Sequence, residues 1–455
     1  MATTPLNTRT ETILRRLVRR EAGPQVRKVL AKTRPEDVAA AMDHMTASER
    51  ASLFRLVEDR ETAASILTNL SDDALIDVVD DVSEDQLVDM LERMEMDDAT
   101  DVVESLPDAL RGRVLAELRG SDTDEVSILL SWPSDSAGGI MSPSFFTMSE
   151  ASNCGRAIQA LQDRGEDYDS VFYVYVIDPH GRLGGVVSLR QLLTHPPSTA
   201  LVSIMTRDVI AVGPRQDQEE VARYVARYDL LAIPVVDEHK RVLGIVTVDD
   251  VIDVIREEAV EDMMLLAGVN DDISAQGKGV FALARNRAGW LLATIGGGVL
   301  AAELIGVWED TLAQVAVLAG FIPVIMGMGG NVGIQSATIT VRGIATGHVQ
   351  LGGALSYIFR EVQVGVVLGL LYGVLLGGYG VVRYLDQPLI GVSVGLSVGL
   401  AIVIASLFGT ATPVVLSRMG VDPAVATGPF VTTVVDLVGI AVYFGIATAL
   451  LPFGS

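Results

Sequence analysis

Cysteine is almost absent from this sequence, with Cys154 the only one among 455 residues. A single thiol excludes a disulfide framework within the chain and is typical of a protein in a reducing compartment. Residues Met1 to Arg20 contain five arginines and no apolar core after them, so they do not form a secretory signal. We therefore expect the first half of the chain to remain in the cytoplasm.

Charged residues are scarce in the last third of the chain, where only seven acidic and seven basic residues follow from Lys278 onward. The other 51 acidic and 27 basic residues precede this point, which places the whole net charge of -24 there. So acidic a surface disfavours nucleic acid and anionic lipid headgroups and favours cations, although a solvated acidic face is the alternative interpretation. The length and the segregated charge together predict several domains.

Short helical segments recur about every twelve residues between residues 70 and 118: SDDALIDVVDDV, SEDQLVDMLERM, EMDDATDVVESL and PDALRGRVLAEL. Each segment places apolar residues at helical spacing after a capping residue. The pattern predicts an acidic, α-helical, superhelical domain over residues 1–132.

A second repeat follows, in which strand-like and helical runs alternate. Residues 176–193 align without gaps on residues 235–252, and Ile-Met-Ser at 140–142 has its counterpart in Ile-Met-Thr at 204–206. This duplication resembles a tandem pair of CBS domains, which implies an α/β module with a first domain at 133–200 and a second at 201–262. The resemblance also implies clefts able to hold adenine nucleotides such as ATP.

CBS domains place a hydroxyl near phosphate and a carboxylate near ribose through the pattern Gly-x-x-Thr/Ser-x-x-Asp. The second copy has this pattern complete, as Gly244, Thr247 and Asp250. In the first copy Gln191 replaces the carboxylate. Two interpretations stay open: the pair binds nucleotide weakly, or it only dimerises and transmits force. The candidate nucleotide-binding residues are Ser188, Arg190 and Thr247.

Five apolar segments in the last third are long enough for membrane spans, which must be helical because lipid offers the backbone no partners. They are Ala288–Trp308, Leu312–Met328, Val362–Val382, Leu389–Leu416 and Ala424–Leu451. Residues 288–455 are thus expected to form an all-α transmembrane domain. The Lys and Arg residues of the short loops place the N-terminal domains in the cytoplasm and the C-terminus outside. Because five spans do not divide into two equal halves, we expect a pore on the axis of a homodimer.

Asp436 is the sole acidic residue of the fifth span, and a carboxylate at such depth is by default functional. One or two carboxylates suit an ion that keeps its water, as Mg²⁺ does. Thr432 and Thr433 are candidates to bind those waters, with helix packing as the equal alternative. The segment PVIMGMGGNVGIQSAT at 323–338, with Asn331, Gly333 and Gln335, is expected to interrupt its helix and to line the pathway.

The two pore segments, at 323–338 and 421–439, resemble the signature of the MgtE family of magnesium channels, and the order of domains agrees. The resemblance implies that Asp436 binds hydrated Mg²⁺ in the pore and that residues 274–287, within a linker at 263–287, form a plug helix along the membrane surface. It also implies regulatory Mg²⁺ sites in the acidic part and at the pore mouth. Their residues would be Asp97, Asp101, Asp229, Asp250, Asp253, Glu258, Glu261, Asp262 and Asp422.

Independently of the resemblance, Asp250, Asp253, Glu257 and Glu261 follow one helical face, where like charges repel and call for a counter-ion. Two other classes are weighed. An intramembrane metalloprotease needs a His-Glu-x-x-His motif, but the membrane half has only His348. An anion channel is disfavoured by one acidic and no basic residue in the last span. The sequence predicts no enzyme, and it leaves open whether Mg²⁺, Co²⁺, Ni²⁺ or Zn²⁺ is the physiological ion.

Overall fold

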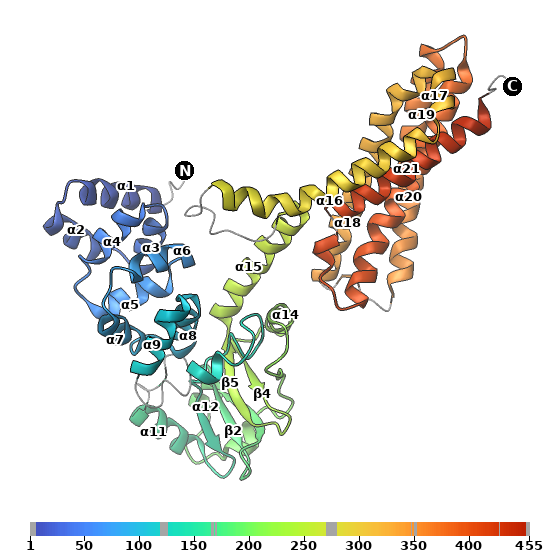
Figure 1. The fold of residues 1–455 in the computed structure, drawn as a ribbon. Coiled ribbons are helices and arrows are strands. Elements are labelled where there is room, and N and C mark those ends of the chain that lie inside the picture. Colours follow the sequence, from blue (N-terminus) through green and yellow to red (C-terminus); the bar gives the residue numbers. More distant parts are fainter. Residues whose placement is uncertain are drawn as a thin grey trace. The chain divides into compact units, whose positions relative to one another are not determined.

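The computed structural model describes residues 6–118, 126–164, 168, 171–269, 280–346, 348–349, 353–426 and 428–451. The fold divides after Glu257 into two compact units (Figure 1). The first unit contains a helical domain and an α/β module, and the second contains the membrane helices. A single helix, α15 (Val248–Leu266), begins in the first unit and ends in the second.

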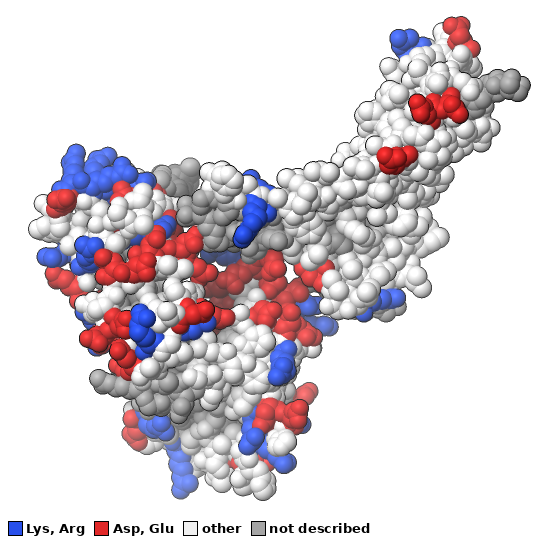
Figure 2. Space-filling view, in the orientation of Figure 1, with Lys and Arg blue, Asp and Glu red and all other residues white. Residues whose placement is uncertain are grey.

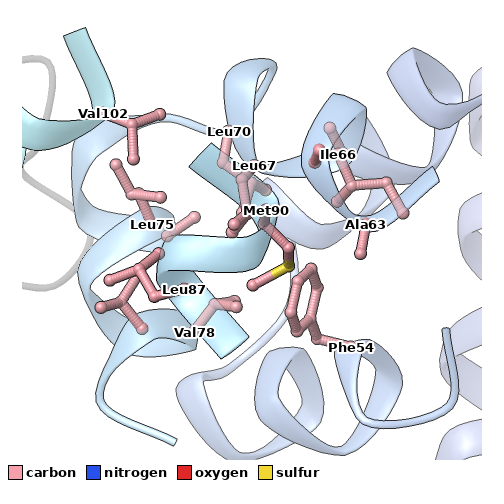
Figure 3. Packing of buried hydrophobic residues seen from close by; sticks show 14 of the residues in the cluster. Phe54, Ala63, Ile66, Leu67, Leu70, Leu75, Val78, Leu87, Met90 and Val102 are labelled. Atoms are coloured by element: carbon pink, nitrogen blue, oxygen red, sulfur yellow. The ribbon is translucent and has the colours of Figure 1, made fainter. Parts of the chain in front are cut away.

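The helical domain is a stack of short helices in which most pack on the helix two positions further along. Thus α1 contacts α3, α3 contacts α5 and α5 contacts α7, while α4 contacts α6 and α6 contacts α8. Leu67, Leu87 and Met90 are almost completely buried in the resulting core (Figure 3). The predicted superhelical domain is confirmed. Its helices are α1 (Leu6–Arg19), α2 (Gly23–Leu30), α3 (Pro35–Asp43), α4 (Ala47–Phe54), α5 (Arg60–Thr68), α6 (Asp72–Val79), α7 (Glu84–Leu91), α8 (Met96–Ser105) and α9 (Asp108–Glu117).

The α/β module repeats one arrangement twice. Strand β2 (Tyr173–Ile177) pairs antiparallel with β3 (Leu183–Ser188), and β4 (Ala232–Val236) pairs antiparallel with β5 (Val242–Thr247). Each hairpin has a register shift at the equivalent position. The remaining elements are β1 (Thr147–Ser149), which pairs parallel with β2, and the helices α11 (Cys154–Arg164), α12 (Leu189–Thr194), α13 (Leu201–Ile204) and α14 (Gln218–Tyr228).

The two repeats exchange the segments that precede them. Ser142 exchanges backbone hydrogen bonds of 2.8 and 2.9 Å with Ile245 of the second repeat, and Thr206 exchanges bonds of 2.9 and 3.0 Å with Val186 of the first. A Cβ atom at Gly185 would lie 2.8 Å from the Thr206 carbonyl, and one at Gly244 would lie 2.8 Å from that of Ser142. Glycine at these positions therefore permits the close approach. The predicted CBS pair is confirmed as one pseudo-symmetric module.

Among the described residues of the second unit, five helices are long and apolar enough to cross a membrane, as predicted. They are α16 (Val280–Gly306), α18 (Ile322–Ala345) with the preceding 3-10 helix η3 (Ala316–Phe321), α19 (Ala354–Arg383), α20 (Pro388–Arg418) and α21 (Pro429–Leu450). The short helix α17 (Glu309–Gln314) follows α16, and the 3-10 helix η5 (Pro423–Ala426) precedes α21.

The second span differs from the prediction. It covers residues 316–345 instead of 312–328, and the Pro- and Gly-rich segment does not interrupt it. Pro323 stands in the first turn of α18, where its missing N–H costs no intrahelical hydrogen bond. The predicted plug helix at 274–287 lies outside the described residues up to 279, and residues 280–287 form the beginning of α16.

Glycines hold α19 against α20, the closest helix pair of the membrane unit. A Cβ atom at Gly369 would lie 2.6 Å from the Gly399 carbonyl oxygen, and one at Gly373 would lie 2.7 Å from that of Gly395. These glycines recur every four residues in both helices, and helices without side chains at the crossing bring their backbones together.

We predict that Gly373→Ala destabilises the detergent-solubilised protein by about 1–3 kcal/mol, because the added methyl group overlaps the α20 backbone. Gly378→Ala, in the same helix but with open space around its Cβ position, is the matched control and should be neutral. Thermal unfolding of the two variants tests this, and equal midpoints would contradict the assigned packing.

Candidate cation sites

The pore candidate Asp436 lies half-buried on α21 and faces α18. Its Oδ1 is 3.8 Å from the position a Cβ would take at Gly330, so the carboxylate lies beside a part of α18 that has no side chain. Within the described residues it has no hydrogen-bond or ion-pair partner. Asp436 is therefore not held by hydrogen bonds to these residues, and its carboxylate oxygens are available to a ligand.

The two threonines next to Asp436 in sequence point to different neighbours. The Thr432 methyl group is 4.0 Å from the Cβ position of Gly330, on the side of Asp436. Thr433 packs instead on α16, where its methyl group and hydroxyl lie 2.3 and 2.7 Å from the Cβ position of Gly297. Of this pair, Thr432 accompanies the carboxylate and Thr433 joins two helices.

The residues predicted on α18 also separate into two groups. Asn331 and Gln335 are exposed and, four residues apart, lie on one face of the helix. Gly333 is buried, with Val431 and Val435 within 3.2 and 3.3 Å of its Cβ position. Gly333 thus sets the contact of α18 with α21, while the two amides form a polar stripe on the exposed side of α18.

A separate cavity of 740 Å³ lies along α19 and α20 and is lined by glycines and aliphatic residues, with Ile446 from α21. Neither Asp436 nor the α18 amides line it. This groove offers no ligand for an ion and is not a candidate for the cation pathway.

A first acidic cluster lies in the first unit, where α8 faces the beginning of α15. Burial, followed by the charges of Asp250 and its neighbours, raises the pKa of Asp97 to about 6. Burial and the adjacent carboxylates raise the pKa of Asp98 and of Asp101 to about 7. The Asp97 side chain is only 8% exposed, and its Oδ1 has no hydrogen-bond partner among the described residues. These carboxylates are close enough to repel one another, and solvent screens the buried Asp97 less than the half-buried Asp98 and the exposed Asp101.

On α15 the same cluster includes Asp249 and Asp250. Burial raises the pKa of Asp250, although its Oδ2 accepts hydrogen bonds of 3.3 and 2.5 Å from the backbone N–H and the hydroxyl of Thr247. Asp98 and Asp249 were not among the sequence candidates. The signal was present, because both belong to acidic doublets in DDATD and VDDVID. Asp229 is placed at the C-cap of α14 in a left-handed conformation, with φ of 51°.

A second acidic cluster lies in the membrane unit, beside the start of η5. Burial raises the pKa of Asp262 to about 6, with Asp422 and Glu258 adding like-charge repulsion. Asp422 accepts a 2.7 Å hydrogen bond from the Ala424 backbone N–H, and Ala424 packs with Leu265 of α15. The last turns of α15 thus contact the segment that leads into α21.

These clusters are looser than a preformed metal centre. Within the described residues, no group of three or more His, Cys, Asp or Glu side chains is arranged to hold one metal ion. The arrangement can lower its repulsion by binding protons, or by binding hydrated cations between carboxylates.

The candidate nucleotide residues are engaged in helix capping. The Ser188 backbone N–H and hydroxyl both donate to Gln191 Oε1 at 2.9 Å, and the Gln191 side-chain amide donates to the Ile204 carbonyl at 3.2 Å. Thr247 and Asp250 form the equivalent pair in the second repeat. Gln191 therefore reproduces the geometry of Asp250 without its charge, and Arg190 beside it is exposed.

The raised pKa values make stability depend on pH. Because folding raises the pKa of Asp98 and Asp101 from ordinary values near 4 to about 7, the folded state binds more protons within this window. Stability should therefore fall as pH rises from about 4 to about 7. Millimolar Mg²⁺ should raise the melting temperature more at about pH 7.5 than at about pH 5. At the higher pH the carboxyl groups of the cluster have lost their protons, so the cation can neutralise them.

Scanning fluorimetry of the detergent-solubilised chain measures this effect. The Asp98→Asn/Asp101→Asn variant should lose most of the pH dependence. An equal gain from Mg²⁺ at both pH values would show that the cluster is not linked to the ion.

Comparison with known proteins supplies the family. Family models match residues 322–446 (MgtE, divalent cation transporter), 33–135 (MgtE intracellular N domain) and 201–257 (CBS domain). The magnesium transporter MgtE of Thermus thermophilus is 37% identical over 439 residues, covering 94% of this chain and 95% of that protein. The Bacillus subtilis magnesium transporter MgtE is 36% identical over 335 residues, covering 74% of each.

Among solved structures, the cytosolic domain of the Mg²⁺ channel MgtE in complex with ATP is 35% identical, with a TM-score of 0.48; the match covers 50% of this chain and 93% of that one. The matched families are a transporter and its regulatory domains, so the chain is not an enzyme and the metalloprotease alternative is wrong. By identity over nearly its whole length, the chain belongs to the MgtE family of divalent cation transporters.

Proposed function

We propose that this protein conducts hydrated Mg²⁺ across the cell membrane along a pathway that passes Asp436. The observation that carries the proposal is a carboxylate inside a membrane helix, half-buried beside Gly330, with no partner among the described residues. An unpaired charge at such depth is costly unless water or a cation accompanies it. The relatives from Thermus thermophilus and Bacillus subtilis are named magnesium transporters, which supports the choice of ion.

The pathway is proposed to lie on the axis of a homodimer. Asn331 and Gln335 are exposed on the α18 surface, and lipid would leave their amide groups without hydrogen-bond partners. A second copy placed against this face covers the amides and brings a second Asp436 toward the first. Two carboxylates, two Thr432 hydroxyls and the amides then bind the water shell of the ion rather than the bare ion, as suits Mg²⁺.

Gating is proposed to follow from the acidic clusters. Mg²⁺ bound between α8 and α15, and between α15 and the η5 segment, would stabilise a closed arrangement of the cytoplasmic part. A bound ion shifts this equilibrium only by its differential affinity for the two states, so several shared sites are needed for a steep response. The proposed regulatory residues are Asp97, Asp101, Asp229, Asp250, Asp253, Glu258, Glu261, Asp262 and Asp422.

Two further proposals complete the assignment. The N-terminal domains lie in the cytoplasm and the C-terminus outside, as the loop charges indicate. Nucleotide such as ATP binds the CBS pair weakly at Ser188, Arg190 and Thr247, because Gln191 offers a neutral amide where the second repeat has a carboxylate.

Asp436→Asn should reduce Mg²⁺ uptake into proteoliposomes at least tenfold, because it removes the negative charge that attracts the hydrated cation within the membrane. Asp386→Asn, which makes the same change in the segment between α19 and α20, is the matched control and should retain uptake. Both variants are first checked for a monodisperse elution profile. Unchanged uptake through a well-folded Asp436→Asn protein would refute the assigned pathway.

Asp97→Asn/Asp101→Asn should make closure less steep in Mg²⁺, because fewer ions distinguish the closed from the open state. Asp80→Asn/Asp85→Asn removes the same charge from exposed positions of the same domain and should leave the curve unchanged. Uptake recorded against the Mg²⁺ concentration on the cytoplasmic face gives both slopes. Identical curves for the two variants would show that the α8 carboxylates are a solvated surface without a role in closure.

A further inference from the structure

The acidic net charge conceals a basic end of the helical domain. Residues 1–34 contain nine Lys and Arg against two Glu, a local charge of about +7 in a chain of net charge -24. Figure 2 shows Lys and Arg gathered over α1, while Asp and Glu predominate around α6. Charge is therefore unevenly distributed over this soluble unit, and its basic end is positive although the unit as a whole is negative.

Part of the basic charge is used within the domain. Arg15 and Arg19 both bind Glu49, the latter at 2.5 Å, and Arg27 pairs with Glu58 at 3.0 Å. Five further Lys and Arg side chains of this segment are exposed and, within the described residues, have neither a hydrogen bond nor an ion pair. We call these residues the basic face: Arg16, Arg20, Lys28, Lys32 and Arg34.

Helical spacing brings an apolar side chain into the basic face. Ile13, Arg16 and Arg20 are three and four residues apart, so they share one side of α1 and its C-terminal turn. Ile13 is 42% exposed although the α1 residue Leu14 is completely buried in the core. Arginines around an exposed aliphatic side chain are typical of helices that lie on a lipid surface.

We propose that the basic face docks on anionic phospholipid headgroups of the bilayer that the same chain spans. Five exposed cationic side chains match the density at which juxtamembrane clusters bind anionic lipid, and five membrane helices keep a bilayer permanently within reach. Tethering raises the effective concentration of that surface, so even weak headgroup contacts become occupied. The proposal requires membrane insertion of the chain, and it does not depend on the proposed pore.

Nucleic acid is the less favoured partner. It is free in solution, gains nothing from tethering, and meets the large acidic excess beyond α2 wherever it extends past the basic face. A bilayer is flat, so the domain can present the basic face to it and keep its acidic sides in water.

The test uses the full-length protein in lipid nanodiscs. A fluorophore is attached at Gln25→Cys, an exposed position in the first turn of α2. The native Cys154 is fully buried, so the label reacts at the new cysteine. A quencher on a small fraction of headgroups reports proximity to the bilayer. We expect stronger quenching in discs that contain phosphatidylglycerol than in pure phosphatidylcholine discs, and a loss of the difference at high salt.

Arg16→Gln/Arg20→Gln should weaken docking about 30-fold, at about 1 kcal/mol for each charge removed. Arg16→Lys/Arg20→Lys should preserve it. Arg156→Gln/Arg182→Gln, which removes two exposed charges from the α/β module, is the matched control and should quench like the parent protein.

Several results would overturn the proposal. They are equal quenching in both lipid mixtures, quenching that persists in Arg16→Gln/Arg20→Gln, and protection of the fluorophore in detergent, which would assign the basic face to an acidic protein surface. Release of quenching by a mixed-sequence RNA at physiological salt would assign it to nucleic acid.

Discussion

Repulsion between neighbouring carboxylates of α8 and α15 is the interaction on which the soluble unit depends. Asp97, Asp98 and Asp101 of α8 face Asp250 of α15, and burial together with the neighbouring negative charges raises the pKa of these four carboxyl groups. The compact arrangement therefore exists at neutral pH only at a cost that bound protons or cations can offset. A hydrated divalent cation suits such a gathering of oxygens, which makes the fold itself sensitive to the ion.

One helix is placed to carry this sensitivity toward the membrane. Helix α15 begins at the Thr247–Asp250 cap and ends where Leu265 packs with Val341 and Ala424. Gly428 follows closely, with the Leu265 and Leu266 carbonyl oxygens 3.6 and 3.4 Å from its Cβ position, directly before α21 and Asp436. Carboxylates at both ends of α15 and a packed contact at the start of α21, which carries Asp436, give the proposed gating a physical route.

Much of this architecture could be predicted from the sequence because it rests on local periodicity. The helical repeats, the CBS duplication and the five apolar spans are all patterns along the chain. The prediction that the segment beginning at Pro323 interrupts its helix is wrong, because a proline is tolerated at the start of a helix although not in its middle. The positions of Gly333 and Thr433 depend on which helices pack against them, and the spacing of residues along the sequence does not reveal those neighbours. The net charge of the chain does not reveal the basic face, because it averages over regions of opposite sign.

The most direct test of the account measures Mg²⁺ uptake into proteoliposomes while Mg²⁺ on the face that carries the soluble unit is varied independently. The account predicts rapid uptake when that face is free of Mg²⁺ and steep, reversible closure as Mg²⁺ there reaches the millimolar range. Uptake that is indifferent to Mg²⁺ on that face would contradict the proposed coupling between the carboxylate clusters and the pore.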